Sequence, residues 1–191
     1  MSEMATVPEM PEVPGSRGLR ETRSTAAWVV AVLVGSAVLG LLGGVIWGEF
    51  APRAMLQEIS TGTAQVINVE TRAYFGADVW FSAITVVAGL LAGLLGYRFA
   101  VAPRDGTARA AVAAALIVGA LAGELVMLWL GERIGLSTYN HELAASANGT
   151  LFSASLALGS KSALAFWPLF TAIVLVIAEW GTRPASPQRE R

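Results

Sequence analysis

Glu124 is the residue whose type and position most clearly require a chemical explanation. It lies inside the apolar run "LIVGALAGELVMLWLGE", which covers residues 116–132. An acidic side chain at the centre of a membrane helix costs roughly 2.5–3.5 kcal/mol, and somewhat less between the centre and the surface, where the spacing places Glu124. Such a residue carries a proton, binds an ion or substrate, or serves as a hydrogen-bonded strut between helices.

Two residues of other apolar runs are predicted at the depth of Glu124. Counting inward from the outer ends of the runs brings Thr85 and Trp167, beside Pro168, to this level. A hydroxyl and an indole N–H are both hydrogen-bond donors, so Glu124, Thr85 and Trp167 form a predicted intramembrane polar node. Because a proton-coupled carrier usually shows a further intramembrane charge, a structural strut is favoured over an ion or substrate site.

The composition argues against several other kinds of site. The chain has no cysteine, which excludes disulfides, zinc–thiolate sites and cysteine nucleophiles. It shows no nucleophile–base pair and no phosphate-binding loop, so we expect neither an enzyme nor a cofactor. The single histidine, His141, falls in a predicted loop, and we expect no metal site. A net charge of −1 without a basic stripe predicts no nucleic-acid partner.

Four long apolar blocks define the fold class. The 191 residues are 54% hydrophobic and 14% charged, whereas soluble proteins have roughly 45–50% and 25%. Each block is long enough to cross a lipid bilayer as a helix. The sequence therefore predicts an all-α integral membrane protein, a four-transmembrane-helix bundle with spans at residues 26–47, 79–99, 108–130 and 163–180. The first block is too long for a cleavable signal peptide and indicates an uncleaved signal anchor.

Charged and aromatic residues predict the orientation of these spans. Arginines concentrate in the two tails and in the short loop between the second and third spans, which places both termini in the cytoplasm. The cytoplasmic tails are then residues 1–25, expected to be disordered, and 181–191, and the outer loops are residues 48–78 and 131–162. Five tryptophans fall at predicted membrane interfaces: Trp28, Trp47, Trp80, Trp129 and Trp180.

Glycines four residues apart recur on three of the predicted spans. This spacing stacks the glycines on one helix face and lets two backbones approach closely. Packing among the four helices of one chain is favoured over a homodimer seam, although both use the same pattern. The predicted packing residues are Gly40, Gly44, Gly48, Gly89, Gly93, Gly119 and Gly123.

The outer loops show patterns of regular structure. "AMLQEI" and "AQVINVE" alternate around "STGT", which predicts a β-hairpin. "STYNHELAASAN" predicts a short helix capped by Ser137 or Thr138, and "TLFSASLAL" alternates again. Together the loops predict a small extracytoplasmic cap of two or three strands.

Charged residues at the span ends have structural interpretations. Asp78 is predicted to be the N-cap of the second span. Glu49 and Glu132 occupy matching positions after the first and third spans, where they are expected to pair with Arg53 and Arg133.

The two halves of the chain resemble each other. "VGSAVLGLLGGVIWGE" (34–49) aligns with "VGALAGELVMLWLGE" (118–132), and each is followed by a polar loop and a second span. The pattern is that of a parallel repeat, but chance similarity between apolar segments is the favoured explanation.

Three segments carry a resemblance to a known family. "WGEFAPR", "YFGADVWFSAITVVAGLLAGLLGYR" and "LAFWPL" resemble small actinobacterial membrane proteins that are grouped only as a domain of unknown function. The resemblance covers about Trp28 to Trp180. It implies four spans, a high-GC Gram-positive source and no assigned activity.

Two functions follow as expectations. Two sizeable outer loops and a minimal inner loop favour a non-enzymatic accessory or scaffold subunit that presents its cap to an envelope protein. The alternative is a small proton- or ion-coupled carrier or channel, working as a homo-oligomer and using Glu124.

Overall fold

The computed structural model describes residues 15–60, 63–66, 72–145 and 150–182. The elements follow one another as α1 (Gly15–Phe50), β1 (Met55–Ser60), β2 (Thr63–Val66), α2 (Arg72–Gly96), the π-helix η1 (Tyr97–Val101), α3 (Gly106–Arg133), α4 (Leu136–Ala145), β3 (Leu151–Ser153), the 3-10 helix η2 (Lys161–Ala165) and α5 (Phe166–Gly181).

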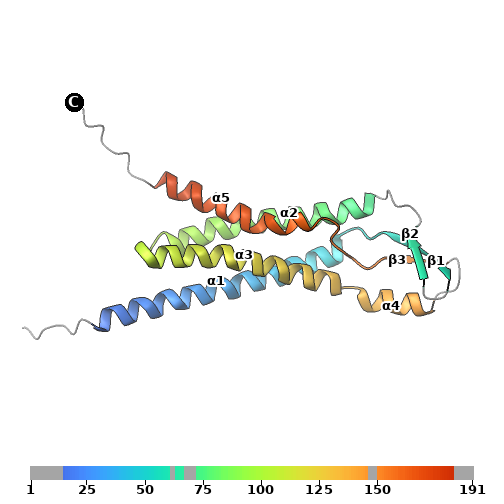
Figure 1. Cartoon of the computed structure of the whole chain (residues 1–191), viewed down its shortest axis with the longest axis horizontal. Helices are drawn as coiled ribbons and strands as arrows, with labels where there is room; N and C mark the ends of the chain where they lie inside the picture. Colours follow the sequence, from blue (N-terminus) through green and yellow to red (C-terminus); the bar gives the residue numbers. More distant parts are fainter. Residues whose placement is uncertain (1–14, 61–62, 67–71, 146–149, 183–191) are drawn as a thin grey trace, which may run out of the picture.

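Four helical segments of the described chain are long and apolar enough to cross a membrane. They are Thr22–Phe50, Phe75–Val101, Gly106–Ala145 and Lys161–Gly181. This confirms the predicted four-helix bundle. In Figure 1 the start of α1 and the end of α5 lie at one end of the bundle, and the strands lie at the other.

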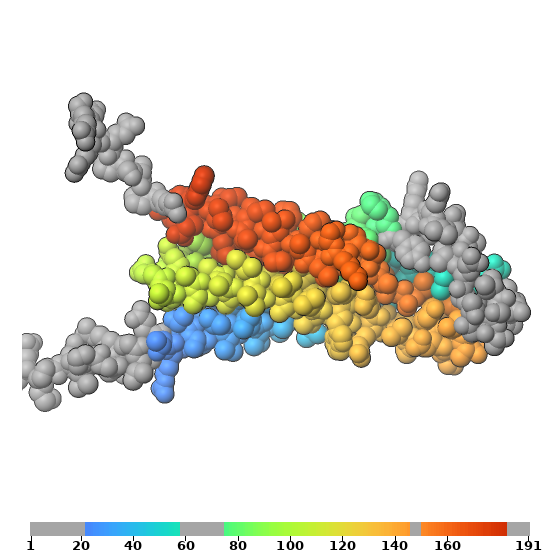
Figure 2. Space-filling model, in the orientation of Figure 1, coloured from blue at the N-terminus to red at the C-terminus, as the bar shows by residue number. Residues whose placement is uncertain are grey.

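Neighbours in the sequence are not the main neighbours in the bundle. Helix α1 packs chiefly along α3, α2 packs chiefly along α5, and contacts between α3 and α5 join the two pairs. In the space-filling view α5, α3 and α1 form three adjacent bands along the length of the molecule (Figure 2).

Glycines allow α1 and α3 to touch backbone to backbone. A Cβ on Gly40 would overlap the carbonyl oxygen of Gly123, and one on Gly123 would lie 2.6 Å from the carbonyl oxygen of Ser36. The same face continues toward the strands, where a Cβ on Gly44 would lie 2.9 Å from the Met127 carbonyl oxygen. These approaches leave no room for a side chain at Gly40, Gly44 or Gly123.

The remaining packing glycines also face helices of this chain. A Cβ on Gly89 would lie 2.7 Å from the carbonyl oxygen of Trp167, and one on Gly93 would lie 2.7 Å from the Cβ of Val174. Gly119 faces Ser36, and Gly48 faces Ile134 just beyond the end of α3. All seven predicted packing glycines therefore lie at intramolecular contacts.

The closest contact between α1 and α3 joins residues that are equivalent in the two aligned segments of the sequence. Gly40 and Gly123 stand at equivalent positions when the two segments are aligned from their Gly-Glu ends, and they meet each other. Residue numbers rise together along both helices at the seam, so the helices run parallel.

The loop between α1 and α2 and the loop between α3 and α5 join into one sheet with the strand order β2-β1-β3. Strand β1 pairs antiparallel with β2, as the predicted hairpin requires, and antiparallel with β3 from the second loop. On one face, Leu56 and Phe152 pack with Tyr139 and Leu143 of α4. The sheet therefore has one covered face.

Several predicted boundaries differ from the structure. Helix α1 begins at Gly15, within the predicted disordered tail, because its Arg, Glu and Leu residues are good helix formers that need no membrane. Helix α4 begins at Leu136, so Ser137 and Thr138 are helical and do not cap it. Gly135 precedes α4 with a φ of +82°, a conformation that favours glycine.

Pro168 does not kink the middle of the fourth span. The span starts as η2 and becomes α-helical at Phe166, so Pro168 falls in the first turn of α5. Backbone N–H groups in a first turn have no intrahelical partner, and a proline there removes no hydrogen bond.

Trp47 is a core residue and not part of an interfacial belt. It is fully buried, its ring packs on Gly131, and it meets Phe81 edge to face with ring centroids 5.0 Å apart. Its indole N–H donates to the carbonyl oxygen of Ala77 at 2.9 Å. The other four tryptophans assigned to interfaces are 38–72% exposed.

Candidate functional site

Glu124 lies on α3 inside the bundle, and none of its surface is exposed. Neither carboxyl oxygen accepts a hydrogen bond that meets ordinary geometry. The backbone N–H of Trp167 comes close enough to act on the carboxyl group without completing such a bond. Glu124 therefore meets neither lipid nor the hydrogen-bonding partners expected from the sequence.

Trp167 and Thr85 are also buried, but they do not donate to Glu124. Trp167 is 1% exposed, its ring lies 3.0 Å from where a Cβ of Gly123 would be, and its indole N–H has no acceptor. Thr85 is fully buried and donates to the carbonyl oxygen of Ser82, one turn earlier in α2, at 3.0 Å. The structure thus buries the three predicted residues without connecting them by hydrogen bonds.

Thr171 is a buried polar residue that the sequence reasoning missed. It is fully buried on α5, and its hydroxyl donates to the carbonyl oxygen of Gly89 at 3.2 Å. This bond ties α5 to α2 where glycine brings their backbones together. The sequence did carry a signal for Thr171, since it is a threonine within an apolar run at the same depth as a glycine on another span.

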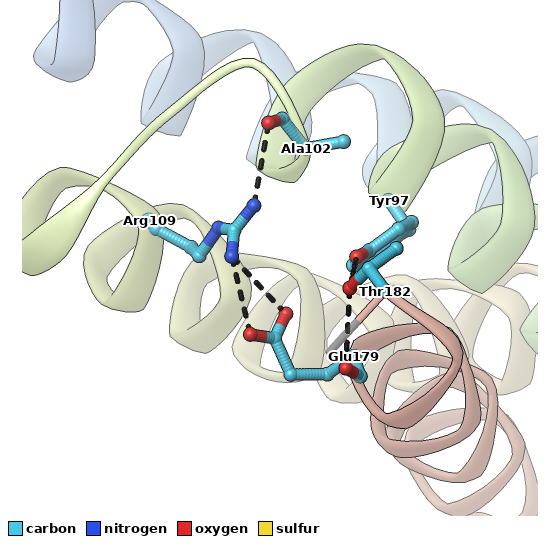
Figure 3. A network of polar contacts seen from close by, with 5 residues as sticks. All are labelled: Tyr97, Ala102, Arg109, Glu179 and Thr182. Atoms are coloured by element: carbon cyan, nitrogen blue, oxygen red, sulfur yellow. Dashed lines mark hydrogen bonds and ion pairs between the residues drawn. The ribbon is translucent and has the colours of Figure 1, made fainter. Parts of the chain in front are cut away.

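A second polar cluster lies at the end of the bundle opposite the cap. Figure 3 shows the Arg109 guanidinium between the carbonyl oxygen of Ala102 and the carboxylate of Glu179. It donates to Ala102 at 3.3 Å and to the two Glu179 oxygens at 3.1 and 3.4 Å. The Tyr97 hydroxyl lies 3.1 Å from that of Thr182, which donates to the Glu179 carbonyl oxygen.

The sequence reasoning did not pair Arg109 with Glu179. Arg109 lies in the first turn of α3 and Glu179 in the last turn of α5, so both stand at the same end of the bundle. Arg109 and Glu179 lie close to the ends of their predicted spans, and this shared depth could have predicted their pairing. Such a prediction would also have needed the knowledge that α3 packs against α5.

Charged residues at the other end anchor the cap to the helices. Asp78 lies within α2 and is not its N-cap, because α2 begins at Arg72. Its carboxylate instead accepts the backbone N–H groups of Gly159 and Ser160 at 2.9 and 3.0 Å, just before η2. Asp78 therefore holds the segment that leads into the fourth span.

Arg53 makes a similar anchor between the first and third spans. It donates to the carbonyl oxygens of Gly48 and Ile134 at 2.7 and 3.1 Å, and not to Glu49 as expected. The Arg133 guanidinium lies over the Trp129 ring, 4.7 Å from its centroid. A guanidinium satisfies helix C-terminal carbonyls well, which explains why Arg53 reaches backbone and not a carboxylate.

His141 is exposed on α4. In the part of the chain that the structure describes, no three histidine, aspartate or glutamate residues gather closely enough to hold a metal ion.

Comparison with known protein families, curated proteins and solved structures gives no match for this chain. The resemblance to the actinobacterial membrane family therefore stays a prediction.

Proposed function

We propose that this protein is a non-enzymatic accessory or scaffold subunit of the cytoplasmic membrane that presents its cap to a protein partner in the cell envelope. In this proposal both termini are cytoplasmic and the cap is extracytoplasmic, as the arginine distribution favours. The source is taken to be actinobacterial, in line with the family resemblance. The observation that carries the proposal is the open face of the cap sheet.

This open face is defined by Met55, Gln57, Leu151 and Ser153. Side chains alternate between the two faces of a strand, so these four point away from the face that α4 covers. Met55 is 46% exposed and Leu151 is 55% exposed. They occupy diagonal positions on paired strands, within reach of each other. Methionine is enriched at the contact sites of proteins, and here it lies beside a second exposed apolar side chain.

The cap is also held in a fixed position, which suits a docking surface. Arg53 and Asp78 tie the loops on either side of the sheet to the ends of the membrane helices. The Trp47 indole adds a buried hydrogen bond between α1 and α2 directly beneath the cap. A surface that is ordered before binding loses less conformational entropy when a partner docks.

Site-specific photocrosslinking in native membranes tests this proposal. A photoreactive amino acid at position 151 is expected to give one discrete protein adduct, and the same residue at the exposed position 141 on α4 is expected to give none. Leu151→Lys should abolish an adduct formed from position 55. An adduct of twice the mass of the chain would identify a second copy as the partner. Absence of any adduct from positions 55 and 151 would contradict the proposal.

One observation favours a second candidate, a small proton- or ion-coupled carrier. Among the described residues, Glu124 is fully buried with both oxygens unpartnered, and the buried indole N–H of Trp167 is unpartnered as well. Buried polar groups without partners are uncommon, and acids within membrane spans often belong to ion or proton pathways.

Flux measurements separate the two candidates. In proteoliposomes, a carrier that uses Glu124 would lose its proton-linked flux in the folded Glu124→Gln variant, and the folded Glu49→Gln variant would keep it. The scaffold proposal expects no such flux in the unchanged protein and an unaltered crosslink from position 151 in Glu124→Gln. A flux that disappears in Glu124→Gln would overturn the scaffold proposal.

A further inference from the structure

A groove runs between α3 and α5 at the end of the bundle opposite the cap. It has a volume of about 350 Å³. Its walls are apolar, with Ala113 and Ile117 on α3 and Ala172 and Val176 on α5. Ile117 is 39% exposed and Val176 is 58% exposed, so the groove opens sideways onto the hydrocarbon of a surrounding membrane.

The polar end of this groove is formed by Arg109 and Glu179. Their side chains are 30% and 38% exposed. The bonds that Arg109 makes to Glu179 and Ala102 are 3.1–3.4 Å long, whereas charge-assisted bonds are commonly about 2.7–2.9 Å. The Arg109 Nε–H is buried and has no acceptor. These long bonds hold the guanidinium loosely.

Two more arginines lie at the same end of the bundle. Arg104 donates to the carbonyl oxygen of Ala100, and its guanidinium lies 4.8 Å from the centroid of the Trp28 ring. Arg98 lies over the Phe99 ring at 5.6 Å. Arginines that rest on aromatic rings where a bundle leaves the hydrocarbon are placed at the level of lipid headgroups.

We propose that this groove binds one anionic phospholipid. An acyl chain lies between α3 and α5 against the alanines, and the phosphate accepts hydrogen bonds from Arg109. The apolar walls select a lipid over a free anion, and Arg109 selects an anionic headgroup over a zwitterionic one. Basic pockets between membrane helices are a known form of anionic-lipid site.

Glu179 acts in this site as a competitor for Arg109 (Figure 3). Its carboxylate binds the Arg109 guanidinium when no lipid is present. A lipid phosphate must then displace the carboxylate or bind the guanidinium beside it. Removal of the Glu179 charge is therefore expected to strengthen lipid binding, although the same change removes an ion pair from the protein. A purely structural ion pair gives no such increase.

Competition between two lipids tests the proposal. The full-length protein is placed in nanodiscs made of equal amounts of phosphatidylglycerol and phosphatidylcholine, and retained lipids are identified by native mass spectrometry. The unchanged protein is expected to retain one phosphatidylglycerol in preference. Arg109→Gln should lower that preference about fivefold, the contribution of one cation near an anionic lipid surface. Glu179→Gln should raise it.

Three further variants separate the groove from general charge effects. Arg133→Gln removes an arginine at the cap end and is expected to leave the preference unchanged. Ala172→Phe fills the groove without changing any charge and should displace the lipid. Arg109→Lys keeps a positive charge and is expected to preserve part of the preference.

Three results would overturn the proposal. The first is equal retention of both lipids by the unchanged protein. The second is an equal loss in Arg109→Gln and Arg133→Gln. The third is release of the lipid by inorganic phosphate, which would indicate a simple anion site. If Arg109→Gln does not fold, Glu179→Gln decides alone, and a preference that fails to rise rejects the site.

Discussion

At the scale of single residues, Glu124 shows how close helix packing can leave a buried polar group without a hydrogen-bond partner. The glycines before it bring α1 and α3 into backbone contact, and the Trp167 ring fills the space beside Gly123. In the described part of the chain, no group around the carboxyl oxygens forms a complete hydrogen bond with them. A buried polar group without a partner costs about 1–3 kcal/mol.

The first prediction concerns the stability that Glu124 costs. Glu124→Met keeps the side-chain length and removes both unpartnered oxygens, so thermal unfolding in detergent should shift upward by an amount equivalent to about 1–3 kcal/mol. Glu49→Met, the same change at an exposed position, should lie within about 0.5 kcal/mol of the unchanged protein. A clear loss of stability in Glu124→Met would mean that the carboxyl group has a partner, such as a buried water.

Asp78 provides a second prediction at this scale. Asp78→Asn leaves only one oxygen for the N–H groups of Gly159 and Ser160, and it removes the charge, so the free energy of unfolding should fall by about 1–3 kcal/mol. Hydrogen exchange at those two amides should become faster. Asp105→Asn is the matched control, because the Asp105 side chain makes no capping hydrogen bond. Unchanged protection of both amides in Asp78→Asn would contradict the anchoring role.

At the scale of elements, glycine on α1 has two different roles. Gly40 faces the Gly123 carbonyl with no space for a Cβ, whereas Gly35 has nothing within 4 Å of that position. Both glycines lie in the same helix and differ mainly in what they face.

The third prediction compares these two glycines. Gly40→Ala should destabilise the bundle by about 1–3 kcal/mol, because the added methyl group must push α1 and α3 apart. Gly35→Ala should be neutral or stabilising by up to about 1 kcal/mol, because alanine favours a helix more than glycine does. Unfolding in mixed micelles measures both. Equal effects of the two changes would show that the α1–α3 seam is not tightly packed.

The sequence predicts the elements of this fold better than their partners. Long apolar runs identify the four spans without ambiguity, and the alternation around "STGT" identifies the β1–β2 hairpin. The pairing of α1 with α3 is different, since the glycine spacing shows that a helix packs closely but not against which neighbour. The Arg109–Glu179 pair was missed for the same reason.

Two single residues show why local patterns failed within the candidate site and around it. Trp47 stands at the end of an apolar run, which is typical of an interfacial residue, but Gly131 on α3 offers a flat surface that buries its ring. Thr85 is at a plausible depth to reach Glu124, yet its hydroxyl finds a nearer acceptor in its own helix. For Trp47 a tertiary contact outweighs position along the chain, and for Thr85 a local hydrogen bond within α2 does so.

At the scale of the whole molecule, the bundle has two unlike ends. Both outer loops meet in one sheet, and the far end carries the start of α1, the short turn before α3 and the end of α5 (Figure 1). The two ends must lie on opposite sides of any membrane that the four helices cross.

The fourth prediction assigns these sides. The chain has no cysteine, so single cysteines can be labelled without background. In intact cells a membrane-impermeant maleimide should label Ser153→Cys on the cap sheet and should not label Asp105→Cys before α3 until the membrane is opened. The reverse pattern would invert the proposed orientation, and labelling of both residues in intact cells would contradict a single orientation.

The pairing of α1 with α3 and of α2 with α5 has a consequence for how the protein is made. The first two helices leave the ribosome without the partners that their glycine faces fit, since those partners are encoded in the second half of the chain. Helices α1 and α2 must therefore remain unpaired in the membrane or at the insertion machinery until α3 has been synthesised. Truncation after α2 should accordingly leave a fragment that is inserted but rapidly degraded.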